Sequence, residues 1–424
     1  MKRLVTGLAF VFSVAAVFAA GRQEATGTTA APVSIVYWQY YYESKVQVID
    51  QLIQKFRTEN PNIKVEQVTF PYENYNQKVA SSLPAGTGPD AINLFYGWLP
   101  LYVKSGYLEP LSPSEFSAET FKSGFFPFVE ESVKFDGKYF SVPTAVRTLA
   151  LLWNKNLFRD SGVDPERPPQ TLDETVSLAR KLSKYDGQGN VVQAGMAMQP
   201  SGQGHNWIRE VLIRQFGGTP YSADGRKVTY NAEEGVAALQ WYIDRITKDK
   251  VGYPGFATDD VTAFKSQTAA MNIDGSFRIA TLNAVKDLDW AVAELPAHRG
   301  LKSNYASFWT HGITAGTKGP KLAASLKFLK YITSADAMDL WLTKVGELPA
   351  NPDFAAKQKD KPFAGVFLKG LDYAHASIFV DEAGQRNVFV DMVDQVILKN
   401  RAPADALQEA AEREQKLIDD FWKK

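Results

Sequence analysis

The chain has 424 residues, with 47 basic and 47 acidic side chains and no cysteine. Its length predicts two or three domains, and an apolar content of 45% is enough to form substantial cores. Balanced charge argues against a nucleic-acid-binding protein, which normally has a basic excess. Without cysteine we expect no disulfide, no cysteine-based metal site and no lipoprotein anchor.

The N-terminus has the features of a secretory signal peptide. Lys2 and Arg3 precede an apolar run, and small residues near its end predict cleavage after Ala19, so the signal would cover residues 1–19. The apolar run is too short to cross a hydrocarbon core about 30 Å thick, which argues against a membrane anchor. Residues 20–32 are small and polar, which predicts a flexible leader on a periplasmic protein.

After the leader, strands and helices alternate. Strands are predicted at 34–38, 63–70 and 90–95, and helices at 46–56 and 75–83. Pro61 ends the first helix, because proline disfavours helical geometry in the residue before it. This alternation predicts a parallel sheet with helical crossovers, in which ligands bind beyond the carboxyl ends of the strands.

The rest of the chain is mostly helical. Asp136 to Lys138 forms a hairpin-like turn, and a buried strand is predicted at 144–153. Further helices are predicted at 172–183, 208–216, 232–248, 261–266, 322–333, 335–345, 388–398 and 403–422.

Five segments resemble the family 1 extracellular solute-binding proteins of ABC sugar importers, the maltose-binding-protein-like group. They are Phe56–Val68, Leu83–Leu111, Asp136–Lys155, Ala263–Phe277 and Gly319–Pro352. Each motif is weak by itself, since sequences such as Gly-Pro-Asp are common, but their shared order makes the resemblance specific.

The resemblance implies an α/β fold, the two-lobed type II periplasmic binding protein fold. Each lobe would be a largely parallel sheet flanked by helices, with the ligand cleft between the lobes. The expected boundaries are 33–143 and 313–356 for the N-terminal lobe, 148–308 and 361–424 for the C-terminal lobe, and hinge crossovers near 143–148, 307–314 and 356–361.

The same resemblance implies a monomeric receptor that captures a mono- or oligosaccharide by lobe closure and delivers it to ABC permease subunits in the membrane. It implies no catalytic residue, no metal, no cofactor and no nucleic-acid partner. Three alternatives stay open: a receptor for glycerol phosphate or another polar solute, a glycoside hydrolase or lyase, and a surface adhesin or sensor without a transporter.

A sugar site needs aromatic rings to cover the C–H face of the sugar and polar groups to bind its hydroxyls. Tyr40, Tyr41 and Glu43 leave the end of the first strand, and consecutive tyrosines there cannot all point into the core. Phe95 and Tyr96 end the third strand. We therefore expect these five residues among the ligand contacts.

Further candidates lie in the region expected to cross into the second lobe. Arg147 sits in an apolar strand and needs a partner, either a structural acid or the ligand, whose hydroxyls or carboxylate suit a planar guanidinium. By the resemblance, His205 and Trp207 fall at ligand-binding positions, although Trp207 could instead face the core. Phe277 falls near the position of a stacking ring, and Asp274 would bind hydroxyls or cap the following helix.

Trp309 lies at an expected crossover, where it would line the cleft or brace the hinge, and Arg386 or Asn387 would also face the cleft. The four histidines show no metal-ligand spacing, and no catalytic serine elbow or phosphate-binding loop is present. Aspartate and glutamate are plentiful, so counting them does not exclude a glycosidase pair.

Overall fold

The structure is a computed structural model that describes residues 31–423. The predicted signal peptide, and the predicted leader up to residue 30, lie outside the described residues. Within residues 31–423, no helix is both long and apolar enough to cross a membrane.

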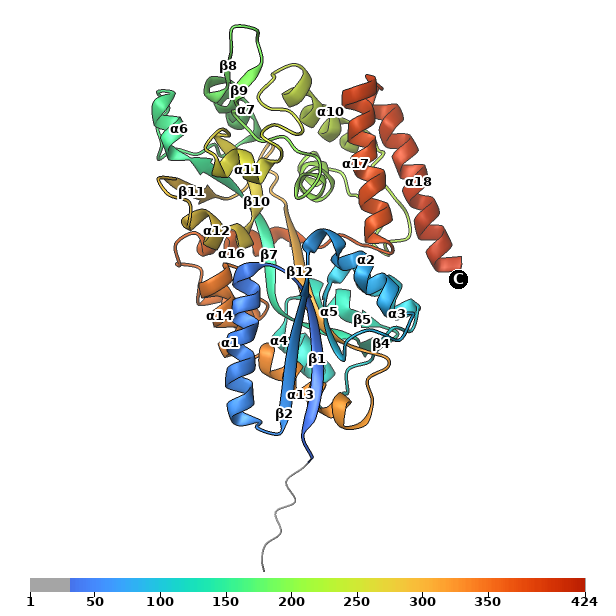
Figure 1. Cartoon of the computed structure of the whole chain (residues 1–424). Coiled ribbons are helices and arrows are strands. Elements are labelled where there is room, and N and C mark those ends of the chain that lie inside the picture. The colour runs from blue at the N-terminus through green and yellow to red at the C-terminus, as the bar shows by residue number, and fades with distance from the viewer. Residues whose placement is uncertain (1–30, 424) are drawn as a thin grey trace, which may run out of the picture.

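A curled sheet extends through both halves of the molecule (Figure 1), and its main path runs β10–β7–β12–β3–β1–β2. The strands on this path are β1 (Val33–Tyr40), β2 (Ile63–Phe70), β3 (Ala91–Phe95), β7 (Ser141–Asn154), β10 (Met271–Gly275) and β12 (Asn304–Thr314). Short strands pair beside them: β4 (Leu108–Glu109), β11 (Trp290–Ala293), β13 (Leu348–Pro349) and β14 (Ala374–His375). Two separate hairpin pairs are β5 (Lys134–Phe135) with β6 (Lys138–Tyr139), and β8 (Lys184–Tyr185) with β9 (Val191–Gln193).

The sheet is mixed. Strand β1 pairs in parallel with β2 and β3, as the strand–helix alternation predicts. Strands β7 and β12 pair antiparallel with each other, and β10 and β11 pair antiparallel with β7. The physical reason is that β7 carries the chain out of the first lobe and β12 brings it back, so the two must run in opposite directions. The two-lobed α/β class is confirmed, but parallel pairing is limited to β1 with β2 and β3 and to the short strand β14 with β12.

Helices cover the sheet in both halves. In chain order they are α1 (Glu43–Glu59), α2 (Tyr72–Ser82), α3 (Leu99–Lys104), α4 (Ala118–Gly124), α5 (Pro127–Val133), α6 (Lys155–Asp160), α7 (Leu172–Leu182), α8 (Gly204–Asn206), α9 (Ile213–Gln215), α10 (Glu233–Thr247), α11 (Asp260–Lys265), α12 (Ile279–Asn283), α13 (Gly319–Ile332), α14 (Ala335–Leu340), α15 (Pro352–Ala356), α16 (Ala364–Gly370), α17 (Glu382–Lys399) and α18 (Pro403–Lys423). Tighter or wider turns are η1 (Tyr96–Trp98), η2 (Trp207–Leu212), η3 (Ser276–Arg278), η4 (Trp341–Val345) and η5 (Leu371–Tyr373).

Two large hydrophobic cores form, with two small clusters beside them. The first includes side chains of β1, β3, α1 and α13, in the lower half of Figure 1, and the second includes side chains of η2, α10, α17 and α18, in the upper half. On β7 the alternation of side chains divides between them, because Leu149 and Leu151 enter the second core and Ala150 and Leu152 the first. The residue boundaries of the lobes stay predictions.

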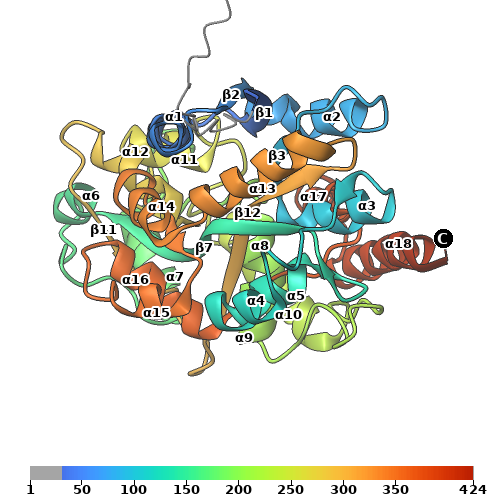
Figure 2. The same cartoon turned by 90° about the horizontal axis from the view of Figure 1, so that it is seen from below.

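Seen from below, α1 and α2 lie on one side of β7 and β12, and α4 and α5 lie on the other (Figure 2). The first helix shows why the sequence pattern was informative: Val48, Ile49, Leu52 and Phe56 are all buried on one face of α1. The crossing pair β7–β12 therefore has two distinct faces, and the functional residues divide between them.

Candidate ligand-binding site

Aromatic rings gather where β1 and β3 end, close to the crossing strand β12. The ring of Tyr40 lies 4.2 Å from that of Trp309, measured between centroids, and 5.4 Å from that of Tyr72. Phe95 and Trp98 lie 5.8 Å and 5.3 Å from Trp309. We call these five residues the aromatic cluster. Parallel strands place their carboxyl ends at one edge of a sheet, which is why side chains so far apart in sequence meet here.

Three members of the aromatic cluster, Tyr40, Phe95 and Trp309, were predicted from the sequence. Tyr72 was not, although it follows directly after β2, whose carboxyl end lies at the same edge. Its side chain is 57% exposed, whereas Tyr40 and Trp309 are 3% and 6% exposed and both pack in the first core. Tyr72 is therefore the member of the aromatic cluster most open to a ligand.

A buried ion triad lies next to the aromatic cluster. Glu347 accepts hydrogen bonds from the Arg147 Nε and from the Lys45 Nζ, the latter at 2.7 Å. The Arg147 Nη2 donates to the Tyr40 hydroxyl at 3.0 Å. Glu347 is thus the structural acid that the sequence offered as one of two partners for Arg147. The other predicted partner, the ligand, stays a prediction. Neither Lys45 nor Glu347 was predicted, because they are 302 positions apart.

Burial and the neighbouring charges together determine which groups of this ion triad are ionised. Desolvation and, to a smaller extent, the Arg147 charge lower the pKa of Lys45, Glu347 partly opposes them, and the net value is about 7. Desolvation acts to raise the pKa of Glu347, but the charges of Arg147 and Lys45 outweigh it and hold that pKa below its usual range. Glu347 is therefore ionised at neutral pH and neutralises one of the two cations.

The far side of the site is formed by the turn that follows β10. The Arg147 guanidinium lies 4.6 Å from the centroid of the Phe277 ring. The Tyr42 hydroxyl donates to the Phe277 backbone oxygen at 3.0 Å. Asp274 accepts from the Gly275 N–H at 2.7 Å and pairs with Arg278 at 2.8 Å, so its carboxylate is held at the start of η3.

A second set of contacts joins η1 to the start of α17. The Trp98 Nε1 donates to Glu382 at 3.1 Å, and Glu382 pairs with Arg386 at 2.8 Å. Gly97 lies between these groups, since a Cβ added there would be 2.7 Å from the Phe379 ring and 3.1 Å from Glu382. The two sides of the site therefore touch each other in this structure.

Other predicted residues lie elsewhere. Trp207 is 3% exposed and packs in the second core, 5.9 Å from Trp241 and 5.8 Å from Tyr242 between ring centroids. The structure favours its core-facing alternative, because η2 is buried along its whole length. Tyr96 stacks on Phe308 at 4.7 Å, on the opposite face of β12 from Trp309, and its ring also contacts that of Phe95 at 4.8 Å.

The remaining predicted residues divide between surface and interior. Tyr41 is 55% exposed, Glu43 is exposed at the start of α1, and neither contacts the aromatic cluster. His205 is buried, and its Nδ1 has no hydrogen-bond partner among the described residues. Burial, together with the charges of Arg209 and Arg386, lowers the pKa of His205 well below its usual range, so its ring is neutral.

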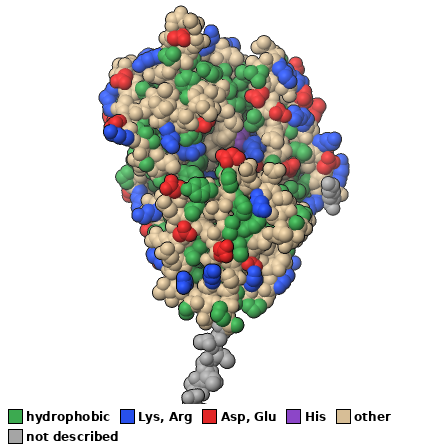
Figure 3. All heavy atoms as spheres, in the orientation of Figure 1, with side chains coloured by type: hydrophobic (Ala, Val, Ile, Leu, Met, Phe, Trp, Pro, Cys, Tyr) green, Lys and Arg blue, Asp and Glu red, His purple; other side chains and the backbone are tan. Residues whose placement is uncertain are grey.

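The face of the molecule in Figure 3 is hollowed between its two halves, and hydrophobic, acidic and basic side chains line the rim of the hollow. Rings from one side and charged groups from both sides could cover and bind a polar molecule that has apolar faces.

The family model described as bacterial extracellular solute-binding protein matches residues 51–364. The maltotriose-binding protein of Pyrococcus abyssi (strain GE5 / Orsay) is 23% identical, covering 80% of this chain and 72% of that protein. The sn-glycerol-3-phosphate-binding periplasmic protein UgpB of Escherichia coli (strain K12) is also 23% identical, covering 94% of this chain and 95% of that protein.

Among solved structures, an ABC transporter solute-binding protein from Thermotoga lettingae TMO, bound with alpha-D-tagatose, has a TM-score of 0.79 at 22% identity, and the match covers 91% of this chain and 99% of that one. The structural likeness establishes the two-lobed fold. The family match spans most of the chain, and we conclude that this protein belongs to the bacterial extracellular solute-binding family.

Proposed function

We propose that this protein is the periplasmic substrate-binding component of an ABC transporter and that it captures a mono- or oligosaccharide between its lobes. The observation that carries the proposal is the aromatic cluster, which faces Phe277 across the Arg147 side chain. Flat rings cover the C–H faces of a sugar, and a guanidinium held in place can bind its hydroxyls. We expect the ligand contacts to be Tyr40, Tyr72, Phe95, Trp98, Arg147, Phe277 and Trp309.

Lobe closure is the proposed mechanism of capture. Contacts such as Tyr42 with Phe277 and Trp98 with Glu382 join the two sides in the present arrangement. Separating the two sides would expose the rings. A sugar that touches both sides would favour the closed state, to the extent that it binds the closed state more tightly than the open state. The closed protein would then deliver the sugar to the permease subunits of the transporter.

Two observations bear on the alternatives. Relatives named for glycerol 3-phosphate support a receptor for a charged solute, but here Glu347 already neutralises one of the two cations beside the aromatic cluster. A glycosidase needs a carboxyl group that can donate a proton to the leaving oxygen. Asp274 and Glu347 are each ion-paired with arginine or lysine, which supports a receptor over a hydrolase.

A thermal-shift screen with maltose, maltotriose, mannobiose, tagatose and sn-glycerol 3-phosphate tests the proposal, because a ligand that binds only the native state raises its melting temperature. Calorimetry on the best ligand then gives the stoichiometry, and chromatography of the incubated sugar shows whether it is cleaved. We expect one sugar to bind per chain and to be recovered unchanged. Cleavage would support the hydrolase instead, and stabilisation by the phosphate alone would support the second kind of receptor.

The site is tested by removing rings. Tyr72→Ala and Trp309→Ala should each lower sugar affinity by about 5- to 150-fold, equivalent to roughly 1–3 kcal/mol per ring. Tyr72 is exposed, so its removal should not disturb folding. Trp422→Ala is the matched control, because that ring is 50% exposed and lies at the C-terminal end of α18. Parental affinity in both cluster variants would contradict the placement of the site.

A further inference from the structure

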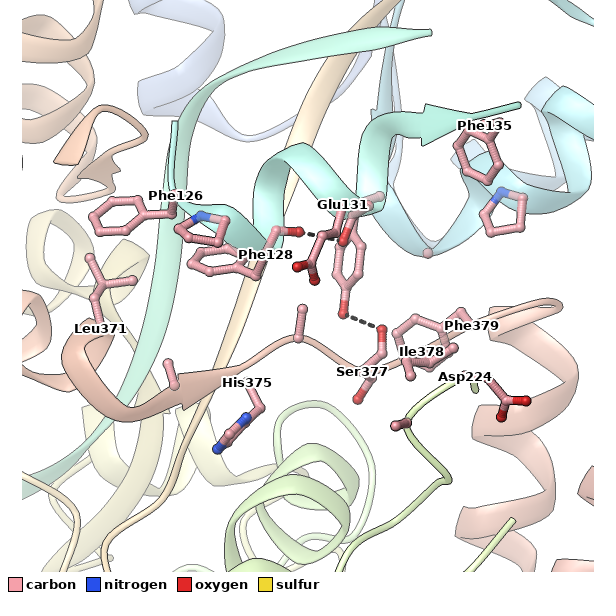
Figure 4. Close-up of a pocket in the computed structure, with 18 of the residues that line it drawn as sticks. Phe126, Phe128, Glu131, Phe135, Asp224, Leu371, His375, Ser377, Ile378 and Phe379 are labelled. Atoms are coloured by element: carbon pink, nitrogen blue, oxygen red, sulfur yellow. Dashed lines mark hydrogen bonds between the residues drawn. The ribbon is translucent and has the colours of Figure 1, made fainter. Parts of the chain in front are cut away.

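A separate cavity of about 630 Å³ lies between the two lobes (Figure 4). One wall is formed by α5 and its flanking residues Phe126 and Phe135. The opposite wall is the segment that runs from β14 to Phe379, together with Asp224. The volume falls in the range of about 300–1,000 Å³ that is typical of small-molecule sites.

This cavity lies on the opposite face of the crossing strands from the aromatic cluster. Successive side chains of a strand point to opposite faces, so Phe308 and Trp309 of β12 divide between them. Phe308 stacks on Tyr96, which lines the cavity, and lies 6.2 Å from the ring of Phe128. Trp309 contacts Tyr40 on the other face. Gly97 and Phe379 border both sites, but none of the seven expected sugar contacts lines the cavity, so the two ligands would have different contacts.

The cavity walls are largely aromatic and aliphatic. The rings of Phe126 and Phe128 lie parallel within 16°, with centroids 5.7 Å apart. Figure 4 shows Phe379, Ile378 and Leu371 along the opposite wall. Ile378 is 41% exposed, although it is a large apolar side chain next to other apolar groups. The apolar lining is therefore partly open, because Ile378, Phe126 and Phe128 retain exposed surface, whereas Leu371 and Phe379 are buried.

The charged groups at the cavity favour a cation. Glu131 extends from α5 toward the opposite wall (Figure 4), and neither Glu131 nor Asp224 forms an ion pair with any described residue. Arg214 is the cation at the rim, and Glu210 neutralises it at 3.1 Å. Burial, with the nearby Arg214 charge, lowers the pKa of His375 below its usual range, so that ring is neutral at pH 7.

We propose that this cavity is a second ligand site, which binds a small organic cation with an apolar body, such as a protonated amine on an aromatic ring. The apolar part would lie against Phe126 and Phe128, and the ammonium group would pair with Glu131. Aromatic faces attract cations as well as apolar groups, so the walls and the carboxylate act together.

Because its two walls belong to different lobes, the cavity changes shape when the lobes move. The walls are in place while Tyr42 and Phe277 are in contact across the other face. A cation that binds this arrangement best would stabilise it and would raise the affinity for sugar. By linkage, the sugar would raise the affinity for the cation by the same factor.

Three probes of similar shape and different charge test the site by calorimetry: phenethylammonium, 2-phenylethanol and 3-phenylpropionate. We expect phenethylammonium to bind at least tenfold more tightly than the other two. Its binding should persist when the proposed sugar site is saturated with the best ligand from the thermal-shift screen. Equal binding of all three probes, or displacement of phenethylammonium by that ligand, would overturn the proposal.

Variants locate the binding. Glu131→Gln and Phe128→Leu should each weaken phenethylammonium binding at least tenfold. Glu130→Gln is the matched control, since it lies on the same helix but its carboxylate bonds Lys134 and Tyr139. Parental binding in both cavity variants would refute the site. If no sugar binds in the screen, the proposed function fails while the probe comparison without sugar still tests this cavity.

Discussion

Replacing Glu347 with glutamine should destabilise the protein strongly. The side chain of Glu347 is 4% exposed, and those of its partners Lys45 and Arg147 are 2% and 11% exposed. Taking one partner from a buried ion pair costs about 3–5 kcal/mol, because it leaves an uncompensated charge in the interior. The amide of glutamine keeps the shape and one hydrogen-bond acceptor, so we place Glu347→Gln near the lower end, at about 3 kcal/mol.

Urea unfolding followed by tryptophan fluorescence measures this change as a shift of the midpoint at constant slope. Glu109→Gln is the matched control: it removes the same charge from a pair in which Lys318 is 63% exposed. An exposed pair contributes about 0–1 kcal/mol, so the control should be close to the parent. A change below about 0.5 kcal/mol in Glu347→Gln would refute the reasoning that the ion triad is a buried electrostatic unit.

The pH dependence gives an independent check. The folded pKa of Lys45 is lowered to about 7 from its ordinary value of 10.5, so between these values the unfolded chain holds a proton that the folded chain has released. Unfolding free energy must then rise with pH across this window, because the cost of burying a charged Lys45 is full below about pH 7 and disappears as pH rises toward 10.5. Lys45→Met lacks the group, so its stability should rise less over the same range. Parallel curves for parent and variant would contradict the assignment.

Two further predictions follow from the packing. Trp207→Ala should lower the unfolding free energy by about 3–5 kcal/mol, because it leaves a cavity where a buried ring was. Calorimetry on the folded variant should show the parental sugar affinity. A large loss of affinity with little loss of stability would instead support the predicted role of Trp207 in binding. Gly97→Ala should weaken sugar binding at least tenfold, because the added Cβ would press on Phe379 and Glu382 where the two sides meet. Stability in urea should be nearly unchanged. Parental affinity would show that Phe379 and Glu382 can move aside without weakening the closed state.

Much of the fold could be predicted because local sequence and local structure agree. Alternation predicted 63–70 as a strand, which is the span of β2, and helical spacing predicted the buried face of α1. The same reasoning placed Tyr40 and Phe95 at strand ends, and the rule that parallel strands end at one edge brought them together.

Tertiary structure alone decided which partner each of these side chains has. Lys45 and Glu347 meet across 302 positions, and no local pattern indicates that pairing. The sequence left Trp207 with two alternatives, the cleft and the core, and the packing of η2 favours the core. Periodicity in the sequence identifies which residues avoid water. The face of the sheet that each side chain occupies depends on how the two lobes pack around the crossing strands. This packing is a property of the whole chain, so no local pattern predicts it.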